Sequence, residues 1–159
     1  MRSQCGSGLA REGGGSVTHE LAGPPPSRAS RVVAPPRPQL SRNAQAMTME
    51  DLEQIVDSEC SDLLVVRAAG GGSILGALTL IHFRIPTGIR AWIEDVVVDA
   101  SARGQGVGKA LIQAAIEKSQ NLRARTLDLT SNPDREPAHR LYEGAGFSVR
   151  TTKVYRHIK

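Results

Sequence analysis

Three glycines at alternate positions mark the segment of this chain that is best suited to hold a charged ligand. They lie in Arg103–Gly108, which follows the apolar run Val96–Val98 and leads into a helical pattern beginning at Val107. The first N–H groups of a helix lack intrahelical partners and lie at the positive end of its dipole. Because glycine lets a ligand approach the backbone closely, we expect phosphate oxygens to accept hydrogen bonds from this loop.

The spacing of this loop excludes two common nucleotide-binding motifs. A P-loop needs Gly, four residues, Gly-Lys and then Ser or Thr, but Arg103 replaces its first glycine and Ala110 follows Lys109. The dinucleotide fingerprint Gly-x-Gly-x-x-Gly also fails, because counting from Gly104 puts Lys109 where the third glycine should stand. The loop therefore indicates a pyrophosphate site of another kind.

Apolar periodicity predicts the elements that carry the loop. Strand patterns cover Leu63–Val66, Ile74–Phe83 and Ile89–Val98, and the turn at Gly70–Ser73 joins the first two into an antiparallel hairpin. The third strand ends on apolar residues that suit a covered, central position. After the loop, Val107–Ser119 has the spacing of an amphipathic helix that rests on the sheet.

The remaining elements complete a mixed sheet. Thr126–Thr130 reads as a strand parallel to the one before the helix, because a crossover helix joins the two. Pro137 begins a short helix that Gly144 or Gly146 can end. Two further short strands are predicted after this helix, at Phe147–Arg150 and Thr152–Ile158. This order indicates an α/β (α+β) fold, with a mostly antiparallel sheet flanked by helices.

Residues 1–46 have a different composition from the rest of the chain. They hold six prolines and six arginines, two acidic residues and no aromatic residue, so we expect a disordered tail. The tail carries the whole net charge of +4, because residues 47–159 contain 14 basic and 14 acidic residues. A neutral folded part argues against nucleic-acid binding. The folded domain is predicted to span residues 47–159 and to open with a short helix capped by Thr48.

Two motifs together resemble the GNAT superfamily of N-acetyltransferases. Arg103, Gly106 and Gly108 fit Arg-x-x-Gly-x-Gly, which is similar to the acetyl-CoA signature of that family. Further on, Asn132 and a helix with Ala-x-x-Leu-Tyr-Glu ahead of Gly-Phe, here Pro137–Phe147, resemble the later family motif. The resemblance runs from about residue 63 to the carboxyl terminus. Within the family, the chain is similar to small stand-alone bacterial members.

The resemblance implies a GNAT-like fold and a direct reaction. An acetyl group would pass from acetyl-CoA to a primary amine of a small-molecule or peptide acceptor, with no acyl-enzyme and no metal. Tyr142 would then donate a proton or hydrogen bond to the CoA sulfur, although its ring could instead only fill the core. Glu94 would take a proton from the ammonium group, directly or through water, with a structural or solvent-facing role as the alternative. Strand alternation would point its neighbour Asp95 to the opposite face.

The family resemblance also implies the residues that contact acetyl-CoA. The strand backbone before the loop would hold the pantetheine arm, Arg103 would pair with a phosphate, and N–H groups from Gln105 to Lys109 would hold the pyrophosphate. Asn132 would reach the pantetheine or the acceptor, or else cap the following turn. The predicted cofactor-binding residues are Val96, Val97, Val98, Arg103, Gly104, Gln105, Gly106, Val107, Gly108, Lys109 and Asn132.

One departure from the family concerns the amino-terminal part. Members usually open with a strand and one or two helices that shape the acceptor pocket, whereas this chain has its tail there and only Thr48–Cys60 can stand for the last helix. Three alternatives follow: the acceptor side is built differently, a partner chain covers it as in a homodimer, or the chain is a catalytically reduced acetyl-CoA-binding or regulatory module.

The expected location is cytoplasmic. No stretch approaches the roughly 18 apolar residues of a membrane span, and the amino terminus lacks the apolar region of a secretory signal. We therefore expect neither a membrane partner nor secretion.

Overall fold

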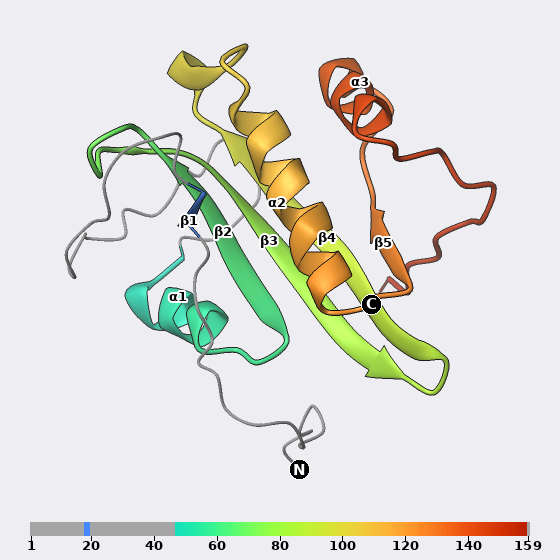
Figure 1. Cartoon of the computed structure of the whole chain (residues 1–159). Helices are drawn as coiled ribbons and strands as arrows, with labels where there is room; N and C mark the ends of the chain where they lie inside the picture. Colours follow the sequence, from blue (N-terminus) through green and yellow to red (C-terminus); the bar gives the residue numbers. More distant parts are fainter. Residues whose placement is uncertain (1–17, 20–46, 159) are drawn as a thin grey trace.

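The computed structural model describes Thr18, His19 and residues 47–158, the first two as backbone only. A single sheet with the order β1-β2-β3-β4-β5 forms its centre (Figure 1). The elements are β1 (Thr18–His19), α1 (Met49–Val56), β2 (Ser61–Arg67), β3 (Ile74–Ile85), β4 (Gly88–Val98), the 3-10 turn η2 (Ala100–Ala102), α2 (Val107–Asn121), β5 (Thr126–Leu129) and α3 (Glu136–Gly144).

The sheet is mixed, as predicted. Strands β2, β3 and β4 pair antiparallel, and β5 pairs parallel to β4. The two-residue strand β1 pairs parallel to β2, a contact that the sequence did not predict. The rest of the predicted disordered tail lies outside the described residues.

The helix α1 begins with the cap predicted at Thr48, which forms a capping box with Asp51. The backbone N–H of Thr48 donates to Asp51 Oδ2 at 2.8 Å, and the Asp51 N–H donates to Thr48 Oγ1 at 3.1 Å. This exchange satisfies two amides that the helix cannot pair internally. Leu52 is the buried residue of α1, which lies next to β2 (Figure 1).

The main core lies between α2 and one face of the sheet. Leu64 of β2 pairs with Leu78 of β3, and both are buried in a cluster that includes Ile93 of β4. The helix α2 contributes Leu111 and Ile112 to this cluster, each at most 1% exposed. Figure 1 shows α2 crossing this face diagonally, which fixes both ends of the helix relative to the strands.

The prediction of two final strands, at Phe147–Arg150 and Thr152–Ile158, is wrong. In the structure these residues form neither a strand nor a helix, and Val149, Val154 and Tyr155 are 90%, 75% and 86% exposed. The prediction depended on β-branched and aromatic residue types. Such preferences express packing on a covered sheet face, which this segment does not find in the described chain.

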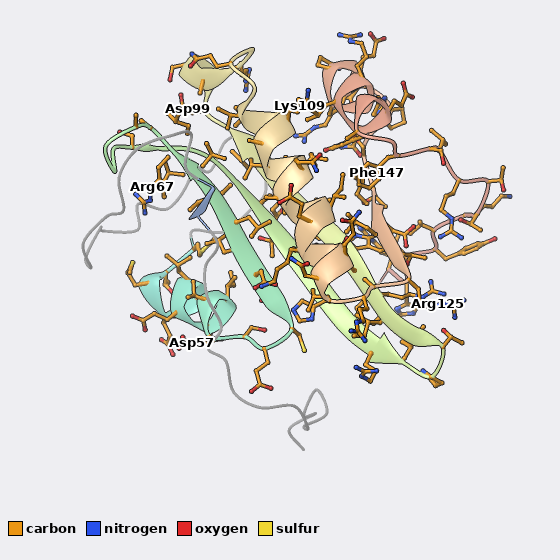
Figure 2. All side chains as sticks on the ribbon, in the orientation of Figure 1. Asp57, Arg67, Asp99, Lys109, Arg125 and Phe147 are labelled. Atoms are coloured by element: carbon orange, nitrogen blue, oxygen red, sulfur yellow. The ribbon has the colours of Figure 1, made fainter. Side chains whose placement is uncertain are left out.

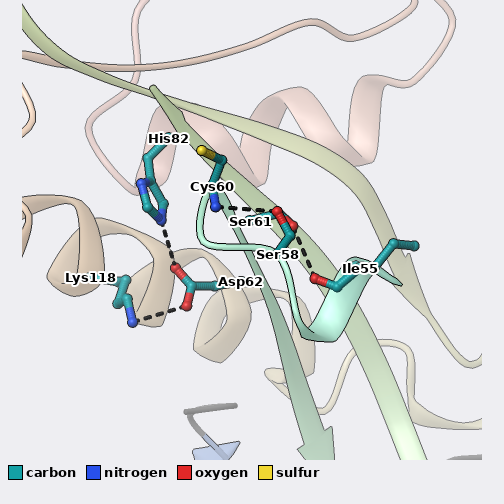
Figure 3. Close-up of polar contacts among 7 residues, drawn as sticks. All are labelled: Ile55, Ser58, Cys60, Ser61, Asp62, His82 and Lys118. Carbon is teal, nitrogen blue, oxygen red and sulfur yellow. Dashed lines mark hydrogen bonds and ion pairs between the residues drawn. The ribbon is translucent and has the colours of Figure 1, made fainter. Parts of the chain in front are cut away.

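A charged cluster ties the far end of α2 to the sheet (Figure 3). Asp62 of β2 lies 3.0 Å from Lys118 Nζ through Oδ1 and 3.5 Å from His82 Nε2 through Oδ2. Burial acts to raise the pKa of Asp62, but the contacts with His82 and Lys118 together outweigh it and hold the pKa below its usual value. Folding therefore favours the ionised form of Asp62 over its protonated form.

We expect Asp62→Asn to lower the free energy of unfolding by about 1 kcal/mol at pH 7, since the ion pairs are only partly exposed. Because the folded pKa is depressed, the stability from Asp62 is present above the ordinary carboxyl pKa and is lost as the pH falls through the folded value. Denaturant unfolding of both proteins from pH 7 downward should give stability curves that converge in acid. A difference that stays constant down to the acid limit would contradict this role.

Candidate active site

The glycine loop between β4 and α2 adopts backbone conformations that favour glycine. Gly104 and Gly106 have φ of +76° and +83°, and a Cβ built on either would have no atom within 4 Å. Before them, Asp99 accepts hydrogen bonds from the N–H and hydroxyl of Ser101, and these bonds lower the pKa of Asp99. The loop is thus held by its own side chain–backbone bonds and leaves both glycines open to a ligand.

The amides at the start of α2 differ in their availability. The Gln105 N–H donates to the Ala102 carbonyl at 3.3 Å, and the Gln105 side chain donates to the Ser101 carbonyl at 2.8 Å. Ala110 is the first residue whose N–H returns to the loop, to the Gly106 carbonyl at 2.9 Å. The N–H groups of residues 106–109 have no acceptor in the described part of the chain, and no side chain caps the helix. The open donors therefore begin one residue after Gln105.

Gly108 has a packing role as well as its place in the motif. A Cβ at this position would lie 3.0 Å from Leu141 Cδ2 and 3.7 Å from Val98 Cγ2. The glycine thus lets the side chain of Leu141, on α3, approach the first turn of α2. Figure 2 shows Lys109 on this turn, with α3 beside the upper end of α2. Lys109 and Arg103 are both exposed, and neither has an ion pair among the described residues.

A β-bulge in β4 changes how Glu94 and Asp95 are placed. Thr79 pairs with Glu94 and Ala77 pairs with Val97, so two residues of β4 stand opposite one residue of β3. Asp95 has a φ of +52°, which is uncommon outside glycine. Because of this extra residue, strict alternation does not hold across the bulge, and both acidic side chains are exposed.

The parallel pair β4–β5 is shorter than β4 itself. Its register ends at Ile93 and Leu129, while β4 continues to Val98. Val96 and Val98 pack against the core under α2, and Val97 is buried on the other face. The backbone of these three valines therefore extends past the last β5 partner, with one edge available to an extended ligand that pairs as a strand does.

Tyr142 lies on α3 and is half-buried against the core cluster. Its ring meets Phe147 edge-on, with the centroids 6.2 Å apart. Burial raises the pKa of Tyr142, and the charge of Arg135 offsets this only in part. The phenol therefore stays protonated at neutral pH and can donate a hydrogen bond. Phe147 lies where the chain leaves α3 (Figure 2).

Asn132 does not cap α3. The residue before the helix is Arg135, and it makes no side-chain cap. Asn132 contributes its carbonyl, which accepts the Arg135 N–H at 3.1 Å, while its side chain is exposed and has no hydrogen bond to the described residues. The amide side chain is therefore available to a ligand, and the alternative that it caps the following turn does not hold.

Comparison with known proteins agrees with this arrangement. Residues 32–147 match the model of the acetyltransferase (GNAT) family. The chain belongs to the GNAT family. The match begins inside the predicted tail, so family-like sequence extends upstream of residue 47.

Individual proteins similar to this GNAT chain include some that are named acetyltransferases. The chain is 32% identical over 69 residues to N-alpha-acetyltransferase 30 of Saccharomyces cerevisiae. The aligned segment covers 43% of this chain and 39% of the yeast protein. An acetyltransferase of Trypanosoma brucei is 29% identical with a TM-score of 0.59, covering 72% of this chain and 83% of that one. A transcriptional regulator from Bacillus halodurans C-125 is also 29% identical, with a TM-score of 0.60, covering 69% and 74%.

The described residues also bear on metal binding and on membrane insertion. No group of three or more His, Cys, Asp or Glu side chains in that part of the chain could hold a metal ion. No helix found there is long and apolar enough to cross a bilayer.

Two features of this site have no signal in the sequence. The bulge at Asp95 follows from sheet register, because neither Glu94 nor Asp95 is a residue type that marks a bulge. The second is Ser131, whose hydroxyl is buried beyond the end of β5 without a hydrogen-bond partner in the described chain. A serine next to Asn132 suggests a turn when only the sequence is read.

Proposed function

We propose that this GNAT chain transfers an acetyl group from acetyl-CoA directly to a primary amine. The observation that carries the proposal is the set of open N–H groups at residues 106–109, at the positive end of a 15-residue helix that has no side-chain cap. Four successive open donors suit a diphosphate, and the open space at Gly104 and Gly106 admits it. Among diphosphate ligands, membership of the GNAT family favours coenzyme A.

The other contacts follow from the same placement. The backbone of Val96–Val98 beyond the last β5 partner is suited to amides of the pantetheine arm, and Asn132 has a free side-chain amide for the same arm or for the acceptor. Arg103 and Lys109 are exposed beside the loop and supply positive charge for the phosphates. The remaining predicted residues shape the loop. Gly104 does so through its backbone conformation, Gln105 through its hydrogen bonds to η2, and Gly108 by allowing the close approach of α3.

The reaction needs three groups from the protein. Glu94, exposed on β4, accepts a proton from the ammonium group, directly or through water, so that the amine lone pair can attack the thioester carbonyl carbon. The carbon–sulfur bond then breaks, and the protonated phenol of Tyr142 donates its proton to the departing thiolate. The acylated nitrogen loses its remaining extra proton through water, which restores the phenol of Tyr142. The third requirement is a hydrogen-bond donor for the oxyanion that forms between attack and carbon–sulfur cleavage.

The cofactor assignment is tested by Gly106→Glu in the full-length chain. The substitution brings bulk and negative charge to the pyrophosphate position, and we expect acetyl-CoA affinity to fall more than about tenfold in calorimetry. Gly71→Glu is the matched control, because Gly71 has a similar φ of +73° and the same open surroundings in the β2–β3 turn. Equal affinity in both variants would refute the loop as the binding site.

Release of free CoA with a panel of amines tests the activity itself. The panel includes small amines and peptides with a free α-amine, because the yeast relative is named an N-alpha-acetyltransferase. One relative of known structure is a transcriptional regulator, which supports a regulatory module as the second candidate. Acetyl-CoA binding without CoA release on any amine would favour that module.

We also propose that residues 47–159 form the acetyltransferase domain, with 1–46 as a tail, and that the protein is cytoplasmic. The described elements from α1 to α3 all lie in 47–159, and only the two-residue strand β1, which pairs with β2, lies in the tail. Limited proteolysis tests the boundary: cleavage should concentrate before residue 47. Since the family match begins at residue 32, protection of residues 32–46 would move the boundary upstream.

A further inference from the structure

Ser131 carries a buried hydroxyl that the folded chain does not use. Its Oγ is shielded from solvent and has no hydrogen-bond partner among the described residues. Leaving a buried hydroxyl unpaired costs about 1–3 kcal/mol, and such groups are few in folded proteins. An unpaired hydroxyl therefore needs a reason, and the position of Ser131 supplies one.

Ser131 lies where β4 and β5 stop pairing. The register of the two strands ends at Leu129, and Ser131 follows two residues later, in the connection to α3. Leu127 and Leu129 pack against the core cluster below α2, and Ser131 has the same parity along the chain. In Figure 1 this connection rises from β5 toward α3 alongside α2. The hydroxyl thus belongs to the region between the free part of β4 and the two helices.

The neighbouring groups suit a ligand that enters from the glycine loop. Val96–Val98 offers an unpaired backbone edge on one side, and Asn132, next to Ser131 in the chain, has an unbonded side-chain amide. Tyr142 lies half-buried on the helix that follows the Ser131 connection. A polar group that passes between these residues would meet the Ser131 hydroxyl away from water, where a hydrogen bond is strong.

We propose that Ser131 binds the acyl-pantetheine arm of the cofactor, through a hydrogen bond to an amide or to the thioester carbonyl. This inference rests on the proposed function and adds a residue that neither family motif contains. The hydroxyl can donate to a carbonyl oxygen and can accept from an amide N–H. In the chain without ligand the unpaired hydroxyl lowers the stability of the fold, and in the complex it forms a hydrogen bond to the ligand.

Calorimetry with acetyl-CoA and with CoA on Ser131→Ala in the full-length chain tests this role. We expect affinity to fall about fivefold, as the loss of one buried hydrogen bond predicts. We also expect the melting temperature of the ligand-free variant to be unchanged or raised, because no bond within the protein is lost. A purely structural residue would show the reverse, with lower stability and unchanged affinity.

Thr126→Val is the matched control. Thr126 Oγ1 is also buried without a partner in the described residues, but it lies at the opposite end of β5, where Thr126 pairs with Arg90. The valine keeps the shape and removes the hydroxyl, so affinity for both ligands should equal that of the natural protein. A loss as large as that of Ser131→Ala would overturn the local role of Ser131.

The two ligands separate the possible contacts. Weaker binding of both acetyl-CoA and CoA assigns the hydrogen bond to a pantetheine amide, and weaker binding of acetyl-CoA alone assigns it to the thioester carbonyl. Unchanged affinity for both overturns the inference while the proposed function stands. If the natural protein binds neither ligand, the proposed function itself fails, and the role of Ser131 fails with it.

Discussion

Tyr142→Phe should lower turnover about 100-fold while acetyl-CoA affinity stays within about twofold. The substitution keeps the ring that meets Phe147 at 6.2 Å, so packing against the core is preserved. It removes only the hydroxyl, whose pKa is raised by burial and which is therefore protonated at neutral pH. Without this donor the thiolate must leave unprotonated, which slows carbon–sulfur cleavage and leaves the ground-state contacts in place.

Steady-state release of CoA, measured with an amine that the natural protein acetylates, gives kcat and KM for both proteins. Tyr155→Phe makes the same chemical change at a side chain that is 86% exposed, and its rate should match the natural protein. An unaltered kcat for Tyr142→Phe would show that the ring only fills the core. A matched loss of kcat and of thermal stability would also argue for packing.

Gly76→Ala should lower the free energy of unfolding by about 2–3 kcal/mol, the upper part of the range for an overpacked core. Gly76 lies on β3 under the first turn of α2. A Cβ there would meet Val107 Cγ1 and the Val97 carbonyl oxygen at 2.8 Å each, and Leu111 Cδ1 at 3.1 Å. The side chains on α2 can move outward, but the carbonyl belongs to the β4 backbone and cannot move without disturbing the sheet.

Urea unfolding of the variant and the natural protein measures this loss. Gly144→Ala is the control, because Gly144 ends α3 and a Cβ on it would have no atom within 4 Å. Alanine there should leave stability unchanged or raise it by about 0.5–1 kcal/mol through helix propensity. Adding Val107→Ala to Gly76→Ala should recover only part of the loss, since the contact with the carbonyl remains. A stable Gly76→Ala protein would mean that α2 is not held this closely to the sheet.

Local patterns account for most of the element order. Apolar and β-branched runs mark β2, β3 and β4, and the helical spacing from Val107 marks α2, because these patterns report which residues are buried. Positions that need a special backbone were also readable: Gly106 stands at the left-handed start of α2, and Gly146, with a φ of +93°, follows the end of α3. The strand prediction failed from Phe147 onward. Residue types there suggested strands, but the described chain offers no strand that pairs with them.

The sequence by itself determined the family and the helix that carries Tyr142, and it predicted a phosphate-binding role for the glycine loop, since each depends on residue type at a fixed spacing. Only the tertiary structure decided which groups are open. It showed that Gln105 bonds within the loop, that a bulge breaks the alternation of Glu94 and Asp95, and that Ser131 has an unused buried hydroxyl. These properties depend on strand register and helix packing between segments distant in the chain, which no local period encodes.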